Sequence, residues 1–318
     1  MNLIVFDLEW NIGYKPKTFL YHGTELTLRG EIIQIGAARI NEHGDVLDTF
    51  EVNLRPRIFR KLQHHIAKVT GMSQGDLDAG MPMRDGLQKF LDWAGPDAEL
   101  AEWGLDDVPV LKQNLFLAGL DESWPAQWYD LQRIFLQTYP RREGEGLTLE
   151  SVVERLGIPK EEPFHNALDD ALYTAKICRK LPLAEGLATY PTGEELLRSA
   201  LLGEDSAARD VRVFMDRLEH DDYKNAPELN SVHCPECGAP LTHDEVWLKR
   251  GNTGYYTRSE CPYCGHWYVR FKLSRRDGLH WSFARCTEPA TREADARWEK
   301  QRAAFVERLR RKKEREQA

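Results

Sequence analysis

The chain has 318 residues, 42% of them hydrophobic and 30% charged, and this length predicts two or more compact units. No apolar run approaches the roughly 20 residues needed to cross a bilayer, and the N-terminus lacks the basic region of a signal peptide. We therefore expect no membrane partner and a cytoplasmic location. The net charge of −8 is uneven, because residues 1–229 hold 25 Lys and Arg against 39 Asp and Glu, whereas residues 230–318 hold 18 against 12. An acidic front and a basic rear indicate chemistry in the first part and contact with a polyanion in the second.

The first predicted element is a strand over residues 2–9, which ends in two carboxylates, Asp7 and Glu9. A short run of β-branched and aromatic residues is typical of a buried strand. Side chains at positions i and i+2 project from one face of a strand, so the two acids are expected side by side. Like charges held this close repel each other unless a cation lies between them. The pair therefore indicates a divalent metal with oxygen ligands.

Up to residue 182 the chain alternates strand and helix patterns. Strands are predicted at residues 31–40, 46–54 and 99–103. Helices are predicted at residues 83–94, 108–117, 147–156 and 167–181. Mixed elements of this kind predict an α/β fold, with helices layered on one central sheet.

Two later segments place acids at helix starts. Residues 102–111 combine a strand end, a turn and a helix start, which puts an acid at the carboxyl edge of the sheet, where α/β proteins bind ligands. Residues 164–171 open the last of these helices, and His165 precedes Asp170 by five positions. This spacing can place an imidazole over a metal that the aspartate binds.

Together these motifs resemble the DEDDh exonucleases of the DnaQ-like, RNase H-like superfamily. Asp7 and Glu9 match the first motif, Asp107 matches the second, and His165 with Asp170 matches the third. The resemblance covers about residues 1–182. It is closest to the exoribonuclease branch that contains the enhanced-RNA-interference nucleases and KapD. It implies an RNase H-like domain with a mixed central sheet flanked by helices.

The resemblance also implies a reaction. The four acids of the three motifs would hold two Mg²⁺ or Mn²⁺ ions about 4 Å apart, and His165 would take a proton from the attacking water as general base. Hard carboxylate ligands suit these ions better than Zn²⁺. The implied activity is 3′→5′ hydrolysis of phosphodiester bonds, with nucleoside 5′-monophosphates as products.

Substrate contacts follow from the same resemblance. The backbone near Leu8, together with Glu9, would bind the terminal 3′-hydroxyl, and Thr70 lies in a segment that resembles the substrate-facing loop of the family. Many members have Thr where this chain has Trp10. The indole could instead stack against the terminal base, as aromatic side chains do on single strands.

Asp106 and Asp169 stand beside two of the chosen acids, and either could be the true ligand. Spacing favours Asp107 and Asp170, and the other two could cap helices. Taken singly, each acid and His165 has an ordinary structural interpretation as a helix cap or a surface residue. The metal site is favoured because all five positions occur in the family order.

The remaining chain changes character twice. The predicted organisation is an exonuclease domain at residues 1–183, a helical connector at 184–229, a zinc ribbon at 230–286 and a charged C-terminal helix at 287–318. Within the connector, Thr192 and Glu195 fit a capping box that opens a short helix. Residues 211–218 also carry an apolar period that we interpret as helical.

The zinc ribbon is predicted from two Cys-x-x-Cys pairs, each followed by glycine. The four residues are Cys234, Cys237, Cys261 and Cys264. Four thiolates favour one tetrahedral, structural Zn²⁺. A redox pair is the alternative, which the two proline-containing copies disfavour. Eight Lys and Arg interleaved with aromatic residues between Val246 and Cys286 favour a single-strand binding surface. The alternative is that the aromatic residues form the core of so small a domain.

We therefore predict a metal-dependent 3′→5′ exonuclease that acts on single-stranded nucleic acid, with RNA favoured over DNA. Two alternatives remain open. One is an exonuclease of DNA repair or proofreading. The other is a catalytically idle adaptor that binds nucleic acid or protein.

Overall fold

The computed structural model describes residues 2–203, 207–217 and 226–317. Contacts divide the chain into two compact units. One comprises Met1–Tyr190 with Arg276–Leu279, and the other comprises Pro191–Arg275 with His280–Ala318. The predicted connector at 184–229 is thus shared between the two units. In the part of the chain that the structure describes, no helix is both long and apolar enough to span a membrane.

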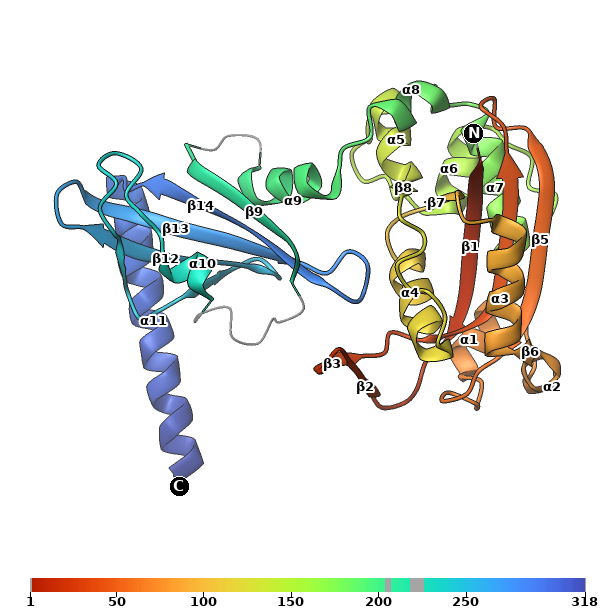
Figure 1. Cartoon of the computed structure of the whole chain (residues 1–318), viewed down its shortest axis with the longest axis horizontal. Coiled ribbons are helices and arrows are strands. Elements are labelled where there is room, and N and C mark those ends of the chain that lie inside the picture. The colour runs from red at the N-terminus through yellow and green to blue at the C-terminus, as the bar shows by residue number, and fades with distance from the viewer. Residues whose placement is uncertain (1, 204–206, 218–225, 318) are drawn as a thin grey trace. The chain divides into compact units, whose positions relative to one another are not determined.

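The first unit is built on a mixed sheet in the order β6-β5-β4-β1-β7-β8 (Figure 1). Its strands are β1 (Leu3–Asn11), β4 (Glu31–Ile40), β5 (Val46–Arg55), β6 (Met81–Pro82), β7 (Glu99–Glu102) and β8 (Trp128–Asp130). β1 pairs antiparallel with β4 and parallel with β7, so it lies in the middle of the sheet. Its position explains the apolar run at the start of the chain, because a central strand is covered on both faces.

Helices cover both faces of this sheet. They are α3 (Met83–Ala94), α4 (Asp107–Ala118), α5 (Leu131–Thr138), α6 (Leu149–Arg155) and α7 (Ala167–Cys178). Alternate side chains of β1 divide between the two layers: Ile4, Phe6 and Leu8 pack with α3 and α4, whereas Leu3 and Val5 pack with α5, α6 and α7. By the same alternation Asp7 and Glu9 belong to the second layer. The predicted α/β architecture is confirmed, and each predicted helix of this layer lies within three residues of its expected bounds.

Several short elements of the first unit were not predicted. Besides β6, β8 and α5 given above, they are β2 (Thr18–Tyr21), β3 (Thr24–Thr27), α1 (His64–Thr70), α2 (Gln74–Ala79) and α8 (Leu183–Ala188). β2 and β3 form a separate hairpin. Because these segments are short, local pattern alone does not distinguish them reliably from loops.

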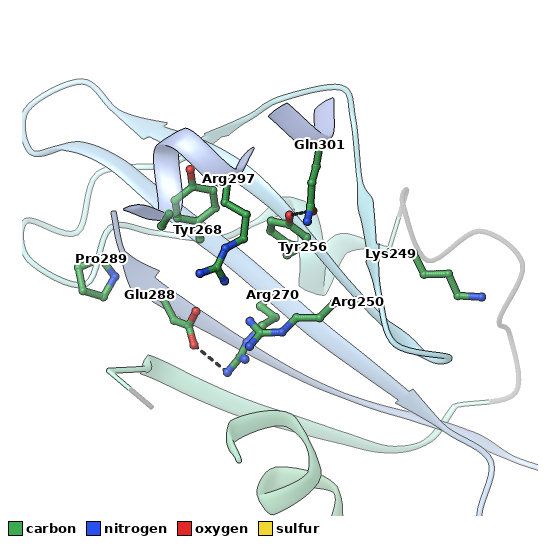
Figure 2. Close-up of a pocket in the computed structure, with 10 residues that line it drawn as sticks. Lys249, Arg250, Tyr256, Tyr268, Arg270, Glu288, Pro289, Arg297 and Gln301 are labelled. Carbon is green, nitrogen blue, oxygen red and sulfur yellow. Dashed lines mark hydrogen bonds and ion pairs between the residues drawn. The ribbon is translucent and has the colours of Figure 1, made fainter. Parts of the chain in front are cut away.

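The second unit contains a sheet in the order β10-β12-β13-β14-β9, with β11 paired to β12. Its elements are α9 (Gly193–Leu202), β9 (Arg209–Arg217), α10 (Pro227–Asn230), β10 (Thr242–His243), β11 (Leu248–Arg250), β12 (Gly254–Cys261), β13 (Gly265–Ser274), β14 (Trp281–Pro289) and α11 (Arg292–Gln317). One face of β13 packs into an apolar core through Trp267, Val269 and Phe271. On the other face, α11 and the sheet border the cavity drawn in Figure 2.

The prediction of a helix over residues 211–218 is wrong. Residues 209–217 form β9, which pairs antiparallel with β14, and residue 218 lies outside the described part of the chain. Val211 and Val213 pack with α9 and β14, whereas Phe214 packs into the opposite core. This alternation and the β-branched valines suit a strand, and a run this short does not separate the two periods reliably. The capping box predicted at the start of α9 is confirmed, since Thr192 and Glu195 exchange both hydrogen bonds.

Candidate functional site

The site begins at the end of β1, where Asp7 and Glu9 lie half-buried on one strand face. Across the antiparallel pair, Asp7 faces Gly36 and Glu9 faces Gln34 of β4. The regular register breaks between Glu9 and Trp10. Pairing resumes with Trp10 opposite Ile32, so Ile33 of β4 is the extra residue of a bulge. Bulges of this kind aim neighbouring side chains differently and are common beside active sites.

A second acid comes from the start of α4. Asp107 is 7% exposed, and the backbone N–H of Leu8 donates to its carboxylate. Glu102, at the end of β7 and fully buried, accepts hydrogen bonds from the N–H groups of Asp107 at 2.8 Å and Val108 at 3.3 Å. Glu102 therefore satisfies the first backbone donors of α4 and fixes the position of Asp107 at the end of β1.

The third acid and the histidine come from the start of α7. Asp170 is buried, and its Oδ2 accepts a hydrogen bond of 3.0 Å from the backbone N–H of His165. His165 is exposed and has a φ of +71°, a backbone conformation that residues other than glycine rarely adopt. Glu9, His165 and Asp170 each offer a ligand atom, and these three atoms lie within 4.8 Å of one another.

The first turn of α7 is held by β4. Gln34 Oε1 accepts a hydrogen bond of 2.8 Å from the backbone N–H of Ala167. At Gly36, an added Cβ would lie 2.0 Å from backbone atoms of Ala167 and Leu168. The absence of a side chain at Gly36 therefore allows α7 to approach β4 closely enough for Asp170 to reach the end of β1.

Replacing Gly36 by alanine is expected to push α7 away from the sheet. Backbone atoms at 2.0 Å cannot rotate aside as a flexible side chain can, and overpacking typically costs about 1–3 kcal/mol or more. We expect a lower thermal unfolding temperature and weaker Mn²⁺ binding. Scanning calorimetry and Mn²⁺ titration measure the two effects.

Gly75 is the matched control, because it lies exposed in α2 and its added Cβ would meet only Ser73 Oγ, at 3.5 Å. Alanine there is expected to keep the unfolding temperature or raise it slightly, since alanine favours helix. Equal unfolding temperatures and equal Mn²⁺ affinities for the two variants would show that the close approach at Gly36 has no such role.

The four carboxylates lie close enough for their negative charges to repel one another. Burial and then the charges of Asp107 and Asp170 raise the pKa of Asp7 well above its ordinary value. Burial and neighbouring acids raise the pKa of Glu9 to about 8, and burial and Asp106 raise that of Asp107 to about 8. Burial also raises the pKa of Asp170 to about 6, against the hydrogen bond from His165. Cations placed among these groups would relieve the repulsion and return the carboxylates to their charged form.

One further observation fits metal ions. Asp170 Oδ1 is buried and has no hydrogen-bond partner among the described residues. Buried polar atoms are nearly always satisfied, so an atom of this kind indicates a missing ligand. Oxygen ligands from several carboxylates suit a hard divalent cation. The arrangement thus fits the Mg²⁺ or Mn²⁺ expected from the sequence.

The structure separates each chosen acid from its neighbour. The Asp106 side chain is 81% exposed and forms an ion pair of 3.2 Å with Arg29. It occupies the N-cap position of α4 but makes no capping hydrogen bond. Asp169 is only half-buried, and the residue that caps α7 is Asn166. The geometry thus brings Asp107 and Asp170 to β1 and leaves their neighbours outside.

The three residues expected to bind substrate have different surroundings. Leu8 is buried, so only its backbone can face a ligand. Trp10 is half-buried and lies against Gly30, where an added Cβ would meet its ring at 2.3 Å. Thr70 ends α1, and its hydroxyl donates to Ile66 O at 2.9 Å. Their contacts with substrate stay a prediction.

Four residues that shape the site were missed by sequence reasoning, namely Gln34, Gly36, Glu102 and Asn166. Two of them carried a usable signal. Gln34 lies between isoleucines in the apolar middle of β4, and Glu102 follows two apolar residues of β7. Isolated polar residues in buried strands require a hydrogen-bond partner, which here is the backbone of a helix start.

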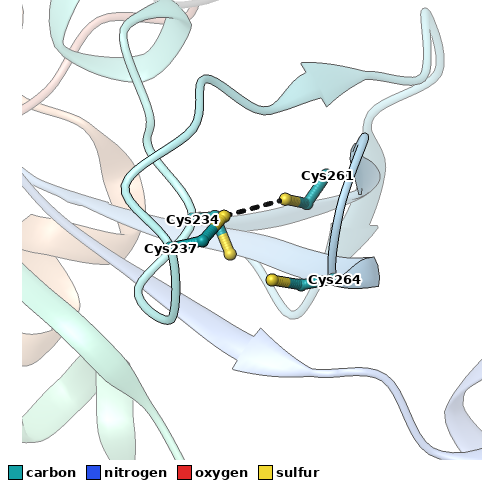
Figure 3. Close-up of side chains that lie close together, drawn as sticks. All are labelled: Cys234, Cys237, Cys261 and Cys264. Atoms are coloured by element: carbon teal, nitrogen blue, oxygen red, sulfur yellow. Dashed lines mark hydrogen bonds between the residues drawn. The ribbon is translucent and has the colours of Figure 1, made fainter.

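A second cluster lies in the other unit, where the sulfur atoms of four cysteines lie within 4.8 Å of one another (Figure 3). They are Cys234, Cys237, Cys261 and Cys264. Four thiolates around a tetrahedral Zn²⁺ with bonds of about 2.3 Å lie about 3.8 Å apart, so the cluster fits that ion. Gly238 and Gly265 follow the two pairs with φ of +74° and +85°, which glycine adopts without strain. Although burial opposes it, N–H groups of Tyr263 and Cys264 lower the pKa of Cys261 to about 7, which favours the thiolate.

Comparison with known proteins gives consistent matches in the first unit. The exonuclease family model matches residues 4–178, a segment that contains all five predicted catalytic residues. The chain is 27% identical over 181 residues to the probable 3′-5′ exonuclease KapD of Bacillus subtilis (strain 168), covering 55% of this chain and 82% of that protein. It is 26% identical over 176 residues to a PolC-type DNA polymerase III of Clostridium perfringens, of which it spans 11%. The solved nuclease domain of 3′hExo, a DEDDh family member bound to rAMP, is 22% identical with a TM-score of 0.47, covering 56% of this chain and 90% of that one.

Proposed function

The chain belongs to the exonuclease family, whose model matches residues 4–178, and we propose that it shortens single-stranded RNA from the 3′ end. The observation that carries this proposal is the convergence of four carboxylates and one imidazole at the end of β1. The relative KapD, named a probable 3′-5′ exonuclease, supports the polarity. Nucleoside 5′-monophosphates would be the products. The cytoplasmic location expected from the sequence stays a prediction.

The proposed metal ligands are Asp7, Glu9, Asp107 and Asp170, and the proposed ions are two Mg²⁺ or Mn²⁺. The orphaned oxygen of Asp170 and the raised pKa values of the other carboxyls support this assignment. When bound, such ions supply an activated water and neutralise charge on the departing 3′-oxygen. Zn²⁺ is proposed for the four cysteines alone, as a structural ion.

His165 is proposed to accept the proton of the attacking water. Its imidazole is exposed, and a ring nitrogen lies within 4.8 Å of carboxylate oxygens of Glu9 and Asp170. The hydrogen bond from its own backbone N–H to Asp170 fixes the loop that carries the ring. A general base needs this combination of access to the reacting water and a fixed position.

Glu9 and the backbone at Leu8 are proposed to bind the terminal 3′-hydroxyl. Trp10 would stack against the last base, and Thr70 would contact the nucleic-acid strand next to that base. A half-buried indole next to the register shift between β1 and β4 supports the stacking role of Trp10. This placement would admit a free 3′ end and exclude the interior of a strand.

RNA is proposed over DNA because the first unit resembles the exoribonuclease branch. The match to a PolC-type DNA polymerase favours a second candidate, which is removal of nucleotides from the 3′ end of DNA. A catalytically idle adaptor is disfavoured, because none of the five residues of the motif is missing. The three candidates differ in what the protein does to matched oligonucleotides.

The test is digestion of 5′-labelled RNA and DNA of one sequence, with Mg²⁺, with Mn²⁺ or with neither. The proposed function predicts a ladder of products that shortens from the 3′ end, faster on RNA than on DNA. The variant His165→Ala should lower the cleavage rate by about 10²–10⁴-fold. His43→Ala is the matched control, since His43 is an exposed histidine in the turn between β4 and β5. Intact label with every metal would overturn the enzymatic proposal, and faster digestion of DNA would select the second candidate.

A further inference from the structure

The second unit contains a cavity of about 320 Å³ that the nuclease site does not use (Figure 2). This volume lies at the lower end of the roughly 300–1,000 Å³ found for small-ligand sites. Its floor is one face of the sheet. Arg270 of β13 pairs directly with Tyr256 of β12, so both project from the same side of the sheet. On β11, Leu248 pairs with Tyr256, and Arg250 lies two positions further along the strand. Arg250 therefore projects from the same side of the sheet.

The roof is a stripe of α11. Ala294, Arg297 and Gln301 line the cavity, and their spacing of three and four residues places them on one helix face. Trp298, between them, is fully buried and packs edge-on against the ring of Tyr256 with centroids 5.4 Å apart. The helix is thus anchored to the sheet beside the cavity, and the cavity walls are formed by ordered packing.

The lining carries four cations and one carboxylate. The cations are Lys249, Arg250, Arg270 and Arg297, and the carboxylate is Glu288. In Figure 2 the side chains of Arg250, Arg270 and Arg297 point toward the same part of the cavity as Glu288. One carboxylate leaves most of this charge uncompensated within the cavity lining.

Arg270 is the most informative of these residues, because it is 6% exposed. Its Nη2 lies 2.7 Å from Glu288 Oε1, although the angle is not that of a hydrogen bond. Its Nε is buried and, within the described ranges, makes no hydrogen bond. Burying a guanidinium with unsatisfied donors is costly unless an acceptor completes the site. An anion with several oxygens would supply the missing acceptors.

The remaining walls are apolar. The half-buried ring of Tyr256, Pro289 and Ala294 border the cavity beside the guanidinium groups. The Tyr256 hydroxyl donates to Gln301, which holds the ring in place. Anion-binding donors next to a flat apolar wall match a nucleotide, which carries a phosphate and a base on one sugar.

We propose that this cavity binds one nucleotide unit of a single strand, with its phosphate on Arg250, Arg270 and Arg297 and its base against the wall formed by Tyr256. The ligand class rests on the proposed function, because a strand held by the second unit would be a strand that the nuclease shortens. The chemistry is shared with a free nucleoside 5′-monophosphate, so the test includes both forms of the ligand. Binding is measured apart from cleavage, which keeps a failure of this inference distinct from a failure of the proposed function.

The experiment measures fluorescence anisotropy of a 5′-labelled single-stranded RNA with the full chain carrying Asp7→Asn, so that the probe is not consumed. The variant Arg250→Gln/Arg297→Gln removes two exposed cations that line the cavity. We expect about tenfold weaker binding at 0.1 M salt and a shallower dependence of affinity on salt concentration, because fewer phosphate charges are neutralised.

The matched control is Arg292→Gln/Lys300→Gln, which removes the same charge from exposed positions of α11 that do not line the cavity. Circular dichroism and zinc content of each variant confirm that the unit is folded. A loss confined to the cavity variant supports the proposal. If AMP competes with the RNA probe in the Asp7→Asn chain but not once the cavity variant is added to it, the cavity also takes the free nucleotide. If AMP competes equally in both chains or in neither, the cavity takes the strand alone. Equal losses of RNA affinity in the two variants, or no loss in either, would overturn the proposed nucleotide site.

Discussion

Replacing Asp107 by asparagine is expected to lower the rate of 3′-end cleavage about a thousandfold, whereas the same change at Asp106 should alter it less than about twofold. Asp107 lies 7% exposed at the end of β1, and its loss removes one anionic ligand of the proposed ions. Metal ions typically supply several kcal/mol of transition-state stabilisation, and each 1.36 kcal/mol corresponds to about tenfold in rate. Asp106 forms an exposed ion pair with Arg29, an interaction worth about 0–1 kcal/mol. Single-turnover rates on 5′-labelled RNA with Mg²⁺ measure the difference.

The unfolding temperatures of the two asparagine variants show whether a lower rate comes from a lost metal ligand or from a lost fold. Burial and neighbouring acids raise the pKa of Asp107 to about 8, so without metal its folded form binds a proton more tightly than its unfolded form. The favourable contribution of that proton is present below the ordinary pKa of aspartate and is lost as the pH rises to about 8. Asparagine cannot ionise, so without added Mg²⁺ at pH 8 the Asp107→Asn chain should unfold at an equal or higher temperature. A larger rate loss at Asp106 than at Asp107 would show that the wrong neighbour had been chosen.

The local parts of the site could be predicted from the sequence. The two acids of β1 share a face because strand geometry has a period of two, which requires only the strand itself. The starts of α4 and α7 were also readable, because each follows a clear change from apolar strand or turn to helical period. The structure brings these three segments to one place. The catalytic roles of their residues stay predictions until the rates of the variants are measured.

The long-range parts could not be predicted. Gln34 and Ala167 are 133 positions apart in the chain, and nothing near either residue indicates their hydrogen bond. Gly36 looks like any glycine in a strand until the backbone of α7 is placed against it. β9 was misassigned for the same reason, since its partner β14 lies far along the chain and its own pattern is short. The cavity likewise requires the register of four strands, β11 to β14, and a helix that packs across them.

Replacing Cys261 by serine is expected to remove the bound zinc and to unfold the second unit. Cys234 and Cys261 are buried within the apolar core of that unit, so its metal ligands are also part of its packing. Structural zinc in small domains contributes about 10–16 kcal/mol, as much as or more than the roughly 5–15 kcal/mol that stabilises a typical domain. Hydrogen exchange should therefore show lost protection in β12 and β13 and retained protection in β1 and β4. Zinc content, measured by atomic absorption, should fall from about one ion per chain to near zero.

Tyr263→Ser is the matched control, because Tyr263 lies in the same turn as Cys261 and Cys264 but is 81% exposed and offers no sulfur. Its backbone N–H, which favours the Cys261 thiolate, survives the change. This variant should keep its zinc and its protection from exchange. The first unit has its own two cores on either side of β1. The Cys261→Ser chain should therefore still cleave short RNA. It should bind longer strands more weakly if the cavity holds a nucleotide. Full zinc content in Cys261→Ser would instead mean that the four thiols do not hold the ion together.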